Sequence, residues 1–280
     1  MNEDKITQEY YANKDTKDFY LNIWGGDSIH IGIYHDTYKY NRNDSKDTKL
    51  KMIKNAIDTK KEYMYKFIQL YFNDNYSNNI ADFGSGYGGT ARYLYDKLKL
   101  NNIKFNIDCF DISPNNCFIN TQKNILNDYK IPVYNMSFLN IPFSKKYNCI
   151  YSEDAFIHIN DRNKIFNELN QKIVLGGLLL FSDIILTDTC NKNEIQEVYD
   201  RIKINNLETH DSYISKANEH GFIFVNSFEY KESMLYHYKN IRDIVDETEN
   251  TKKIIVGLDN WIKHIELNNI TSKIFVFKKI

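Results

Sequence analysis

The chain has 280 residues, and its 36 Lys and Arg side chains nearly balance its 37 Asp and Glu side chains, which gives a formal net charge of −1. This balance excludes the strongly basic surface of a nucleic-acid-binding protein. The N-terminal sequence MNEDKITQEYY is charged, unlike a signal peptide, and the longest apolar run, residues 173–181, is too short to cross a bilayer. The four cysteines show no C-x-x-C spacing, so we expect no metal site and a reducing, cytoplasmic location.

Two segments precede the first predicted strand. Residues 1–40 form an aromatic-rich, partly helical lead, and the polar residues 41–51 are expected to be a loop. Apolar side chains then recur at helical spacing and predict an amphipathic helix over residues 52–71.

Strands and helices alternate after this helix. Strands are predicted at 80–83, 105–110, 133–136, 147–151 and 178–181, and helices at 90–99, 115–127 and 162–173. Such alternation is typical of a parallel sheet with crossover helices. Gly176 and Gly177 are expected to separate the last of these helices from the last strand.

The C-terminal third is predicted to complete the sheet. Residues 186–210 have weak helical character, a helix is expected near 211–220, and the apolar segments 222–228 and 274–277 favour an antiparallel pair. We therefore predict one α/β domain with a doubly wound, mostly parallel sheet of seven strands. Its expected parts are an N-terminal lid and substrate segment (1–51), a cofactor-binding core (52–185), a helical cap insertion after the fifth strand (186–221), and C-terminal strands and helices (222–280).

A glycine-rich turn carries the sharpest local signal. The sequence IADFGSGYGG (residues 80–89) runs from a predicted strand into a predicted helix. Gly84, Ser85 and Gly86 lie where the backbone must turn tightly and let a ligand approach. The next predicted strand leads into Asp111 and Ile112, and a carboxylate at this place accepts the hydroxyls of a ribose. The pattern predicts a cofactor that contains a nucleoside.

Asp82 favours S-adenosylmethionine over a dinucleotide. Its carboxylate stands directly before the glycines, where it attracts an ammonium group and repels a pyrophosphate. A turn without a ligand, a nucleotide-binding protein without transferase activity, and a dehydrogenase that uses NAD are the alternatives, and Asp82 disfavours the last of them.

Three longer stretches carry a resemblance to known proteins: YYANKDTKDFYLNIWGGDSIHIGIY (10–34), DFGSGYGGTARYL (82–94) and YSEDAFIHINDRNKIFNEL (151–169). They are similar to class I methyltransferases, and among these to the sarcosine and dimethylglycine N-methyltransferases that make glycine betaine. The short stretches DRI (200–202) and YHYKNIR (236–242) are similar in matching order. The resemblance implies a Rossmann-like fold, S-adenosylmethionine as methyl donor, and sarcosine or dimethylglycine as acceptor.

Phosphoethanolamine N-methyltransferases share the pattern Y-S-x-D-A-x-x-H and look like more distant relatives. A tyrosine and a histidine form a catalytic pair in those enzymes, and the resemblance implies the same role for Tyr20 and His158. Their phosphate-binding arginine is Glu153 here, and a carboxylate repels a phosphate and attracts a cationic amine. We therefore rank phosphoethanolamine low. A different small amine stays open as the acceptor, because the betaine-forming enzymes are expected to carry an amide at this place.

Methyl transfer to an amine needs a base, because an amine is mostly protonated at neutral pH. His158 is the predicted base and Tyr20 its hydrogen-bonding partner, although a histidine in the apolar sequence AFIHI is also typical of a protein core. Aromatic faces suit a quaternary ammonium, and a guanidinium suits a carboxylate. The predicted substrate-binding residues, for each of which packing or surface placement is the alternative, are Trp24, Tyr34, Glu153, Arg201, His237 and Tyr238.

Further cofactor contacts are predicted outside the glycine-rich turn. Ser137 and Phe138 follow a predicted strand where this fold holds the adenine, and the Phe138 ring offers a stacking surface. Tyr11 is expected to close over the donor as a lid that excludes water. Glu153 completes the predicted cofactor-binding set. The expected partner is a small-molecule amine, with no nucleic acid or membrane, and the chain is expected to be a monomer or a homodimer.

Overall fold

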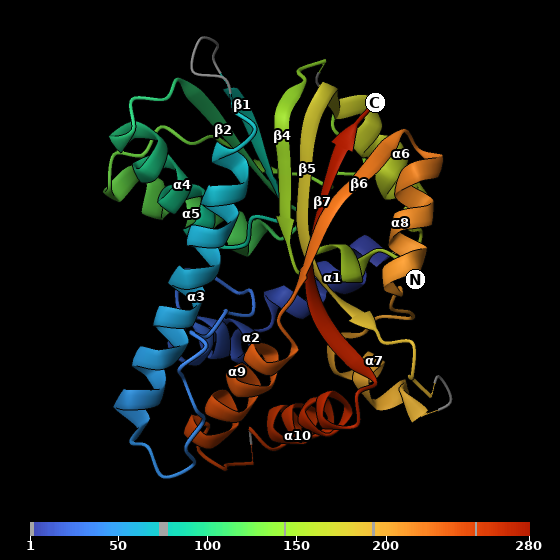
Figure 1. Cartoon of the computed structure of the whole chain (residues 1–280). Helices are drawn as coiled ribbons and strands as arrows, with labels where there is room; N and C mark the ends of the chain where they lie inside the picture. Colours follow the sequence, from blue (N-terminus) through green and yellow to red (C-terminus); the bar gives the residue numbers. More distant parts are fainter. Residues whose placement is uncertain (1–2, 73–77, 143, 192–193, 250) are drawn as a thin grey trace.

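The computed structural model describes residues 3–72, 78–142, 144–191, 194–249 and 251–280. Its strands are β1 (Asn78–Phe83), β2 (Phe105–Asp111), β3 (Val133–Asn135), β4 (Tyr147–Glu153), β5 (Ile173–Leu186), β6 (Phe222–Glu229) and β7 (Ile270–Lys279). They form one sheet in the order β3-β2-β1-β4-β5-β7-β6 (Figure 1). The first five strands are mutually parallel, and β7 runs antiparallel to both of its neighbours. The predicted mostly parallel α/β sheet and the antiparallel C-terminal pair are confirmed.

Helices cover both faces of the sheet. They are α1 (Glu3–Ala12), α2 (Lys14–Phe19), η1 (Tyr20–Trp24), α3 (Lys46–Gln69), α4 (Gly89–Leu100), α5 (Pro114–Leu126), η2 (Phe156–His158), α6 (Arg162–Lys172), α7 (Gln196–Ile202), α8 (His210–Glu219), α9 (Lys231–Ile244) and α10 (Lys252–Glu266). Figure 1 shows α3, α4 and α5 on one side of the sheet and α6 and α8 on the other. Among the described residues, no helix is long and apolar enough to span a membrane.

Alternate residues of the central strands fill two separate apolar clusters. Ile80 of β1 and Leu180 of β5 belong to the cluster under α3 and α4, whereas Ala81 and Phe181 belong to the cluster under α6 and α8. Successive side chains of a strand point to opposite faces, so a strand covered on both faces is apolar throughout. This explains why residues 173–181 of β5 read as a continuous apolar run.

Two predicted boundaries were wrong. Helix α3 begins at Lys46 rather than in the fifties, because the Ser45 side chain caps it by accepting a hydrogen bond of 3.2 Å from the Thr48 backbone N–H. Residues 46–51, predicted as loop, are therefore helical. Strand β5 begins at Ile173 and continues through Gly176 and Gly177, which were expected to precede it. Its pairing with β4 shifts register there, and Gly176 has a φ of +76°, so the glycines form an irregularity inside the strand.

Helices from both ends of the chain form a layer beyond one end of the sheet. Figure 1 shows α1 and α2 at the end toward which β4 points, with α9 and α10 beyond them. No bounds were predicted for α9 and α10, which follow β6 and precede β7 in the chain. Ligands of open α/β sheets bind outside the carboxyl ends of the parallel strands. This arrangement therefore directs the search for a site to the space between these strand ends and the N-terminal helices.

Candidate active site

The glycine-rich turn lies between β1 and α4. Gly84 and Gly86 have φ angles of +79° and +52°, which favour glycine. The Asp111 carboxylate at the end of β2 accepts hydrogen bonds of 2.8 Å from the backbone N–H groups of Gly86 and Ser113. Burial raises the pKa of Asp111 to about 6, although these backbone donors act in the opposite direction. The pairing of turn and acid expected from the sequence is present in the structure.

The main cavity of the site opens beside this turn, and its space, including the part open to solvent, is about 650 Å³. Its lining includes ten residues that bring together most of the predicted cofactor set and part of the lead segment: Tyr11, Ile29, Gly84, Asp111, Ile112, Ser137, Phe138, Glu153, Asp154 and His158. Helix α1 closes one side, where the Gln8 side chain donates to the Ile112 carbonyl at 3.2 Å. These residues fit a nucleoside with a carboxylate for its ribose and a ring for its base.

A smaller cavity continues on the other side of the turn. It is lined by Asp27, Ser28, His30, Asp82, Ser85, Thr90 and Glu153, among others. The Tyr151 hydroxyl donates to the Asp82 carboxylate at 2.8 Å. Burial raises the pKa of Asp82 well above its ordinary value. Two buried carboxyl groups, Asp82 and Glu153, thus face a small space that suits the amino-acid end of a cofactor.

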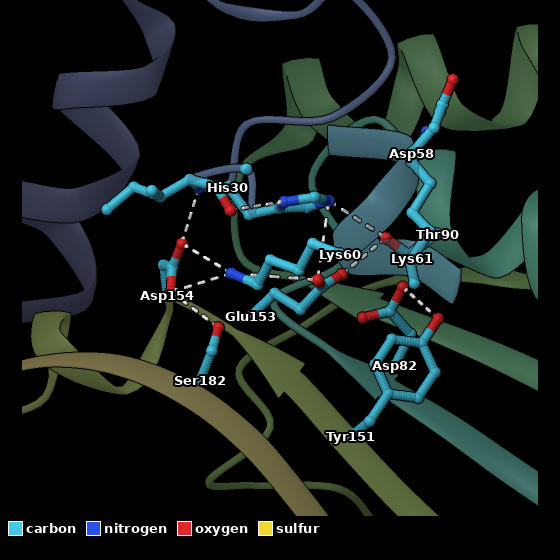
Figure 2. Close-up of polar contacts among 12 residues, drawn as sticks. His30, Asp58, Lys60, Lys61, Asp82, Thr90, Tyr151, Glu153, Asp154 and Ser182 are labelled. Carbon is cyan, nitrogen blue, oxygen red and sulfur yellow. Dashed lines mark hydrogen bonds and ion pairs between the residues drawn. The ribbon is translucent and has the colours of Figure 1, made fainter. Parts of the chain in front are cut away.

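A buried polar cluster connects β4 to α3 and to the lead segment (Figure 2). The Lys60 ammonium, fully buried, lies 3.2 Å from an Asp154 carboxylate oxygen. Burial alone lowers the pKa of Lys60, but the Asp154 carboxylate overcomes this and raises it above its ordinary value. Asp154 also accepts from the Ile31 backbone N–H at 2.9 Å and from the Ser182 hydroxyl at 2.6 Å.

Sequence reasoning predicted Asp82 and Glu153 of the residues in Figure 2 but missed Lys60, Asp154 and His30. Asp154 lies in the stretch that carried the resemblance, where it could have been found as the acidic residue directly after a buried strand. It adopts a left-handed φ of +54°, which an aspartate tolerates better than most residues. Lys60 looks like any lysine of an amphipathic helix. His30 lies in the first stretch that carried the resemblance but was not predicted as a site residue, and it approaches both Thr90 and Glu153 in the structure.

The predicted base, His158, bonds to Tyr11 rather than to Tyr20. The Tyr11 hydroxyl lies 3.2 Å from His158 Nε2, and the Tyr20 hydroxyl lies 3.2 Å from that of Tyr10. The Tyr11 and Tyr20 rings are neighbours, with centroids 6.0 Å apart. Burial lowers the pKa of His158 to about 4, so the imidazole is neutral near pH 7 and can accept a proton.

An aromatic pocket lies on the far side of His158. Its lining includes Tyr11, Tyr20, Trp24, Asp154, His158, Arg201, Tyr238 and Trp261. The Arg201 guanidinium carbon lies 5.8 Å from the Trp24 ring centroid, 5.2 Å from that of Tyr238 and 5.0 Å from that of Trp261. Within the described parts of the chain, Arg201 forms no ion pair with a carboxylate. A buried guanidinium without a counter-ion favours an anionic ligand group.

Three predicted substrate residues lie outside this pocket lining: Tyr34, His237 and Glu153, which lines the two cavities beside the glycine-rich turn instead. Tyr34 faces α9, where Asn240 donates to its hydroxyl at 3.2 Å. His237 packs edge-on against Trp24, with ring centroids 5.0 Å apart, and its Nδ1 accepts from the Gly32 backbone N–H. The structure therefore places Trp24, Arg201 and Tyr238 around one space, with His237 behind them and Tyr34 farther away. The roles of all these residues stay predictions.

The fold and the site are those of a class I methyltransferase: a seven-stranded sheet with an antiparallel strand beside β5, a glycine-rich turn after β1, and an acidic residue at the end of β2. Residues 57–234 match the methyltransferase domain family, and the chain belongs to that family.

Particular members of this family resemble the whole chain. The sarcosine/dimethylglycine N-methyltransferase of Halorhodospira halochloris is 26% identical over 98% of this chain and 96% of its own length. The enzyme of the same name from Aphanothece halophytica is 28% identical over 92% of this chain and 91% of its own length. The crystal structure of a candidate sarcosine dimethylglycine methyltransferase from Galdieria sulphuraria, 27% identical, superposes with a TM-score of 0.81 over 95% of this chain and 98% of its own.

Proposed function

We propose that this chain is an S-adenosylmethionine-dependent N-methyltransferase that methylates sarcosine and dimethylglycine to give glycine betaine. The proposal combines the family membership with the names of the relatives that match along the whole chain. The single observation in the site that supports it best is Arg201, a guanidinium without a carboxylate partner among the described residues, in a pocket next to His158.

The donor would lie in the two cavities on either side of the glycine-rich turn. Asp111 would accept the ribose hydroxyls, Phe138 would pack against the adenine, and Asp82 and Glu153 would face the amino-acid end. When bound, S-adenosylmethionine supplies an electrophilic methyl group next to a sulfonium. The contribution of the protein is to hold donor and acceptor in attack geometry and to exclude water, which α1 does by covering the cavity.

The acceptor would lie in the aromatic pocket. A sarcosine or dimethylglycine molecule carries a carboxylate and an amine separated by one carbon atom. Arg201 would bind the carboxylate, because a guanidinium offers paired N–H donors to it. Trp24 and Tyr238 offer aromatic faces to the methylated ammonium group, which loses its N–H donors as methylation proceeds. Asp154, which lines the same pocket, supplies a negative charge for this group.

His158 would take the proton that leaves the acceptor nitrogen. Its Nε2 is the atom that Tyr11 contacts, and a neutral imidazole with an unprotonated Nε2 accepts a proton directly or through the Tyr11 hydroxyl. Burial raises the pKa of Tyr11 well above its ordinary value, so the phenol stays neutral and is suited to relay a proton rather than to hold a charge.

A methylation assay on the purified chain tests this function. S-adenosylmethionine is supplied with sarcosine, dimethylglycine, phosphoethanolamine or N,N-dimethylethanolamine, and products are identified by mass. We expect sarcosine and dimethylglycine to gain methyl groups and the two amines without a carboxylate to react at least tenfold more slowly. Methylation of N,N-dimethylethanolamine alone would leave the donor site standing and refute the proposed acceptor. The cytoplasmic location and a monomeric or homodimeric state remain predictions.

A further inference from the structure

One oxygen of Glu153 is buried in the smaller cavity without a hydrogen-bond donor. The Glu153 side chain is only 7% exposed, and among the described residues none donates a hydrogen bond to its Oε1. Its other oxygen, Oε2, accepts from the Thr90 hydroxyl at 2.5 Å. A buried carboxylate oxygen left in this way costs free energy unless a ligand supplies a donor. Glu153 lines both the large cavity and the smaller one, so its free oxygen can reach a molecule that occupies both.

His30 does not supply the missing donor. Its Nδ1 lies 3.3 Å from the Ile31 carbonyl oxygen, and its Nε2 lies 3.3 Å from the Thr90 hydroxyl oxygen. Burial, followed by the charges of Lys60 and Lys61, lowers the pKa of His30 well below its ordinary value and keeps the ring neutral. Its Nε2 also lies 3.5 Å from Glu153 Oε1 but makes no hydrogen bond to this oxygen.

Lys60 does not supply the donor either. Its ammonium lies 4.0 Å from Glu153 Oε1, beyond hydrogen-bond distance. Its hydrogen bonds go to the two Asp154 carboxylate oxygens, at 3.2 and 3.4 Å, and Figure 2 shows the ammonium directed toward Asp154. The charge of Lys60 is thus matched by Asp154 and leaves Glu153 without a full counter-ion.

The groups that surround Glu153 leave room for one more positive charge. They are the neutral His30 from the lead segment, Lys60 and Lys61 from α3, Asp82 from β1, Thr90 from α4 and Asp154 from the same turn. Lys60 is paired with Asp154, and Lys61 is paired with Asp58 at 3.0 Å. Asp82 adds a second acidic group on the cavity side. An ammonium group has the charge and the N–H donors that this arrangement lacks.

We propose that Glu153 binds the α-ammonium group of the methyl donor through its Oε1 and thereby fixes the amino-acid end of the donor beside the glycine-rich turn. The inference rests on the proposed S-adenosylmethionine site and adds one residue and one ligand group to it. It also assigns Glu153 to the donor rather than to the acceptor. The aromatic pocket supports this choice, because Asp154 lines it and Glu153 does not.

Binding of two product analogues to two proteins tests this assignment without turnover. S-adenosylhomocysteine and its analogue with hydrogen in place of the α-amino group are titrated calorimetrically into the unmodified protein and into Glu153→Gln. In the unmodified protein, we expect loss of the ammonium group to weaken binding about 10- to 100-fold, as for a hydrogen bond between charged groups. In Glu153→Gln, the same loss should weaken binding by roughly threefold or less, since the partner charge is gone.

The control variant is Glu247→Gln, because Glu247 is exposed and lies after α9, outside the cavities. It should reproduce the affinities of the unmodified protein. If Glu153→Gln does not fold, as judged by circular dichroism, Glu153→Asp replaces it. The shorter aspartate side chain holds its carboxylate farther from the ammonium group, so loss of this group should again weaken binding less than in the unmodified protein.

The assignment of the ammonium to Glu153 would be overturned if loss of the ammonium group weakened binding equally in the unmodified protein and in the folded Glu153 variant. It would also be overturned by a Glu153→Gln protein that binds S-adenosylhomocysteine normally but shows a raised KM for the amine acceptor. Failure of S-adenosylhomocysteine to bind the unmodified protein would refute the donor proposal itself, which separates the two failures.

Discussion

The Tyr11 hydroxyl lies 3.2 Å from His158 Nε2, although the two residues are 147 positions apart in the chain. Tyr11 belongs to α1, and His158 ends the short turn η2 after β4. The contact therefore exists only when α1 is folded over the carboxyl ends of the strands. In this structure, the helix that covers the site also contacts the proposed base.

Removal of either partner should slow the chemical step. We expect His158→Ala to lower kcat about 100- to 10,000-fold, the usual range for a general base, and Tyr11→Phe to lower it about tenfold or more. Tyr20→Phe is the matched comparison, because the Tyr20 hydroxyl contacts Tyr10 rather than His158. Steady-state rates at saturating donor and acceptor measure all three. A larger loss of kcat in Tyr20→Phe than in Tyr11→Phe would favour Tyr20 and His158 as the catalytic pair, as the resemblance implies.

The lowered pKa of His158 predicts how the reaction rate and the folding stability depend on pH. The folded pKa is about 4, below the ordinary value of 6.5, so the base stays neutral until the pH falls toward 4. At saturating donor, protonation of His158 should therefore cause no loss of rate between pH 7.5 and 5.5. The same shift means that the unfolded chain binds more protons between pH 6.5 and 4, so stability falls as the pH falls through this window.

Urea unfolding at pH 7.5 and 4.5 tests the linkage. The free energy of unfolding of His158→Gln should fall less between these two pH values than that of the unmodified protein. An unmodified enzyme whose acid limb lies near pH 6.5 and vanishes in the variant would show that burial does not shift this pKa.

Arg201 should determine affinity for the carboxylate of the acceptor. Arg201→Met keeps the length of the side chain and removes its charge, and we expect it to raise the KM for dimethylglycine about 10- to 100-fold. The affinity for S-adenosylhomocysteine should change less than threefold, because Arg201 lines the aromatic pocket and not the large cavity. Arg242→Met serves as control, since Arg242 pairs with Asp259 at the surface. An unchanged KM would exclude Arg201 as the carboxylate anchor.

We expect the stability of the fold to require Lys60 and Asp154 together, because each buried charge needs the other. Lys60→Met leaves the Asp154 charge buried without its counter-ion, so we expect it to lower the free energy of unfolding by about 3–5 kcal/mol. The double variant Lys60→Met with Asp154→Asn should recover most of this loss. Lys61→Met is the neighbouring control and should cost about 1 kcal/mol or less, because its partner Asp58 is half-exposed. Equal losses for the two lysines, measured by urea unfolding, would contradict this account.

The parts of the fold that local sequence determines were predicted well. Strand β1, the glycine-rich turn and the start of α4 follow one another within residues 78–100, so apolar alternation and glycine spacing were enough to identify them. Asp111 could be assigned because the end of a parallel strand adjacent to β1 must lie beside that turn. The errors at α3 and β5 arose where one serine cap and one glycine pair decide a boundary.

The contacts that make the site depend on tertiary structure and gave no local signal. Lys60 and Asp154 meet across 94 positions, and nothing in an amphipathic helix distinguishes a lysine that enters the core from one that faces water. The choice between Tyr11 and Tyr20 depends on how α1 and η1 fold back on each other. Arg201 was identified only through its place in a matching stretch, and the aromatic rings around it come from separate helices.

Transfer of a labelled methyl group tests the central claim most directly. The purified chain is incubated with S-adenosylmethionine carrying a trideuterated methyl group and with dimethylglycine, and the products are measured by mass spectrometry. The account predicts glycine betaine with three deuterium atoms, formed by the unmodified protein and strongly reduced in His158→Ala. Binding of S-adenosylhomocysteine without any labelled betaine, or labelled betaine that His158→Ala forms equally well, would contradict it.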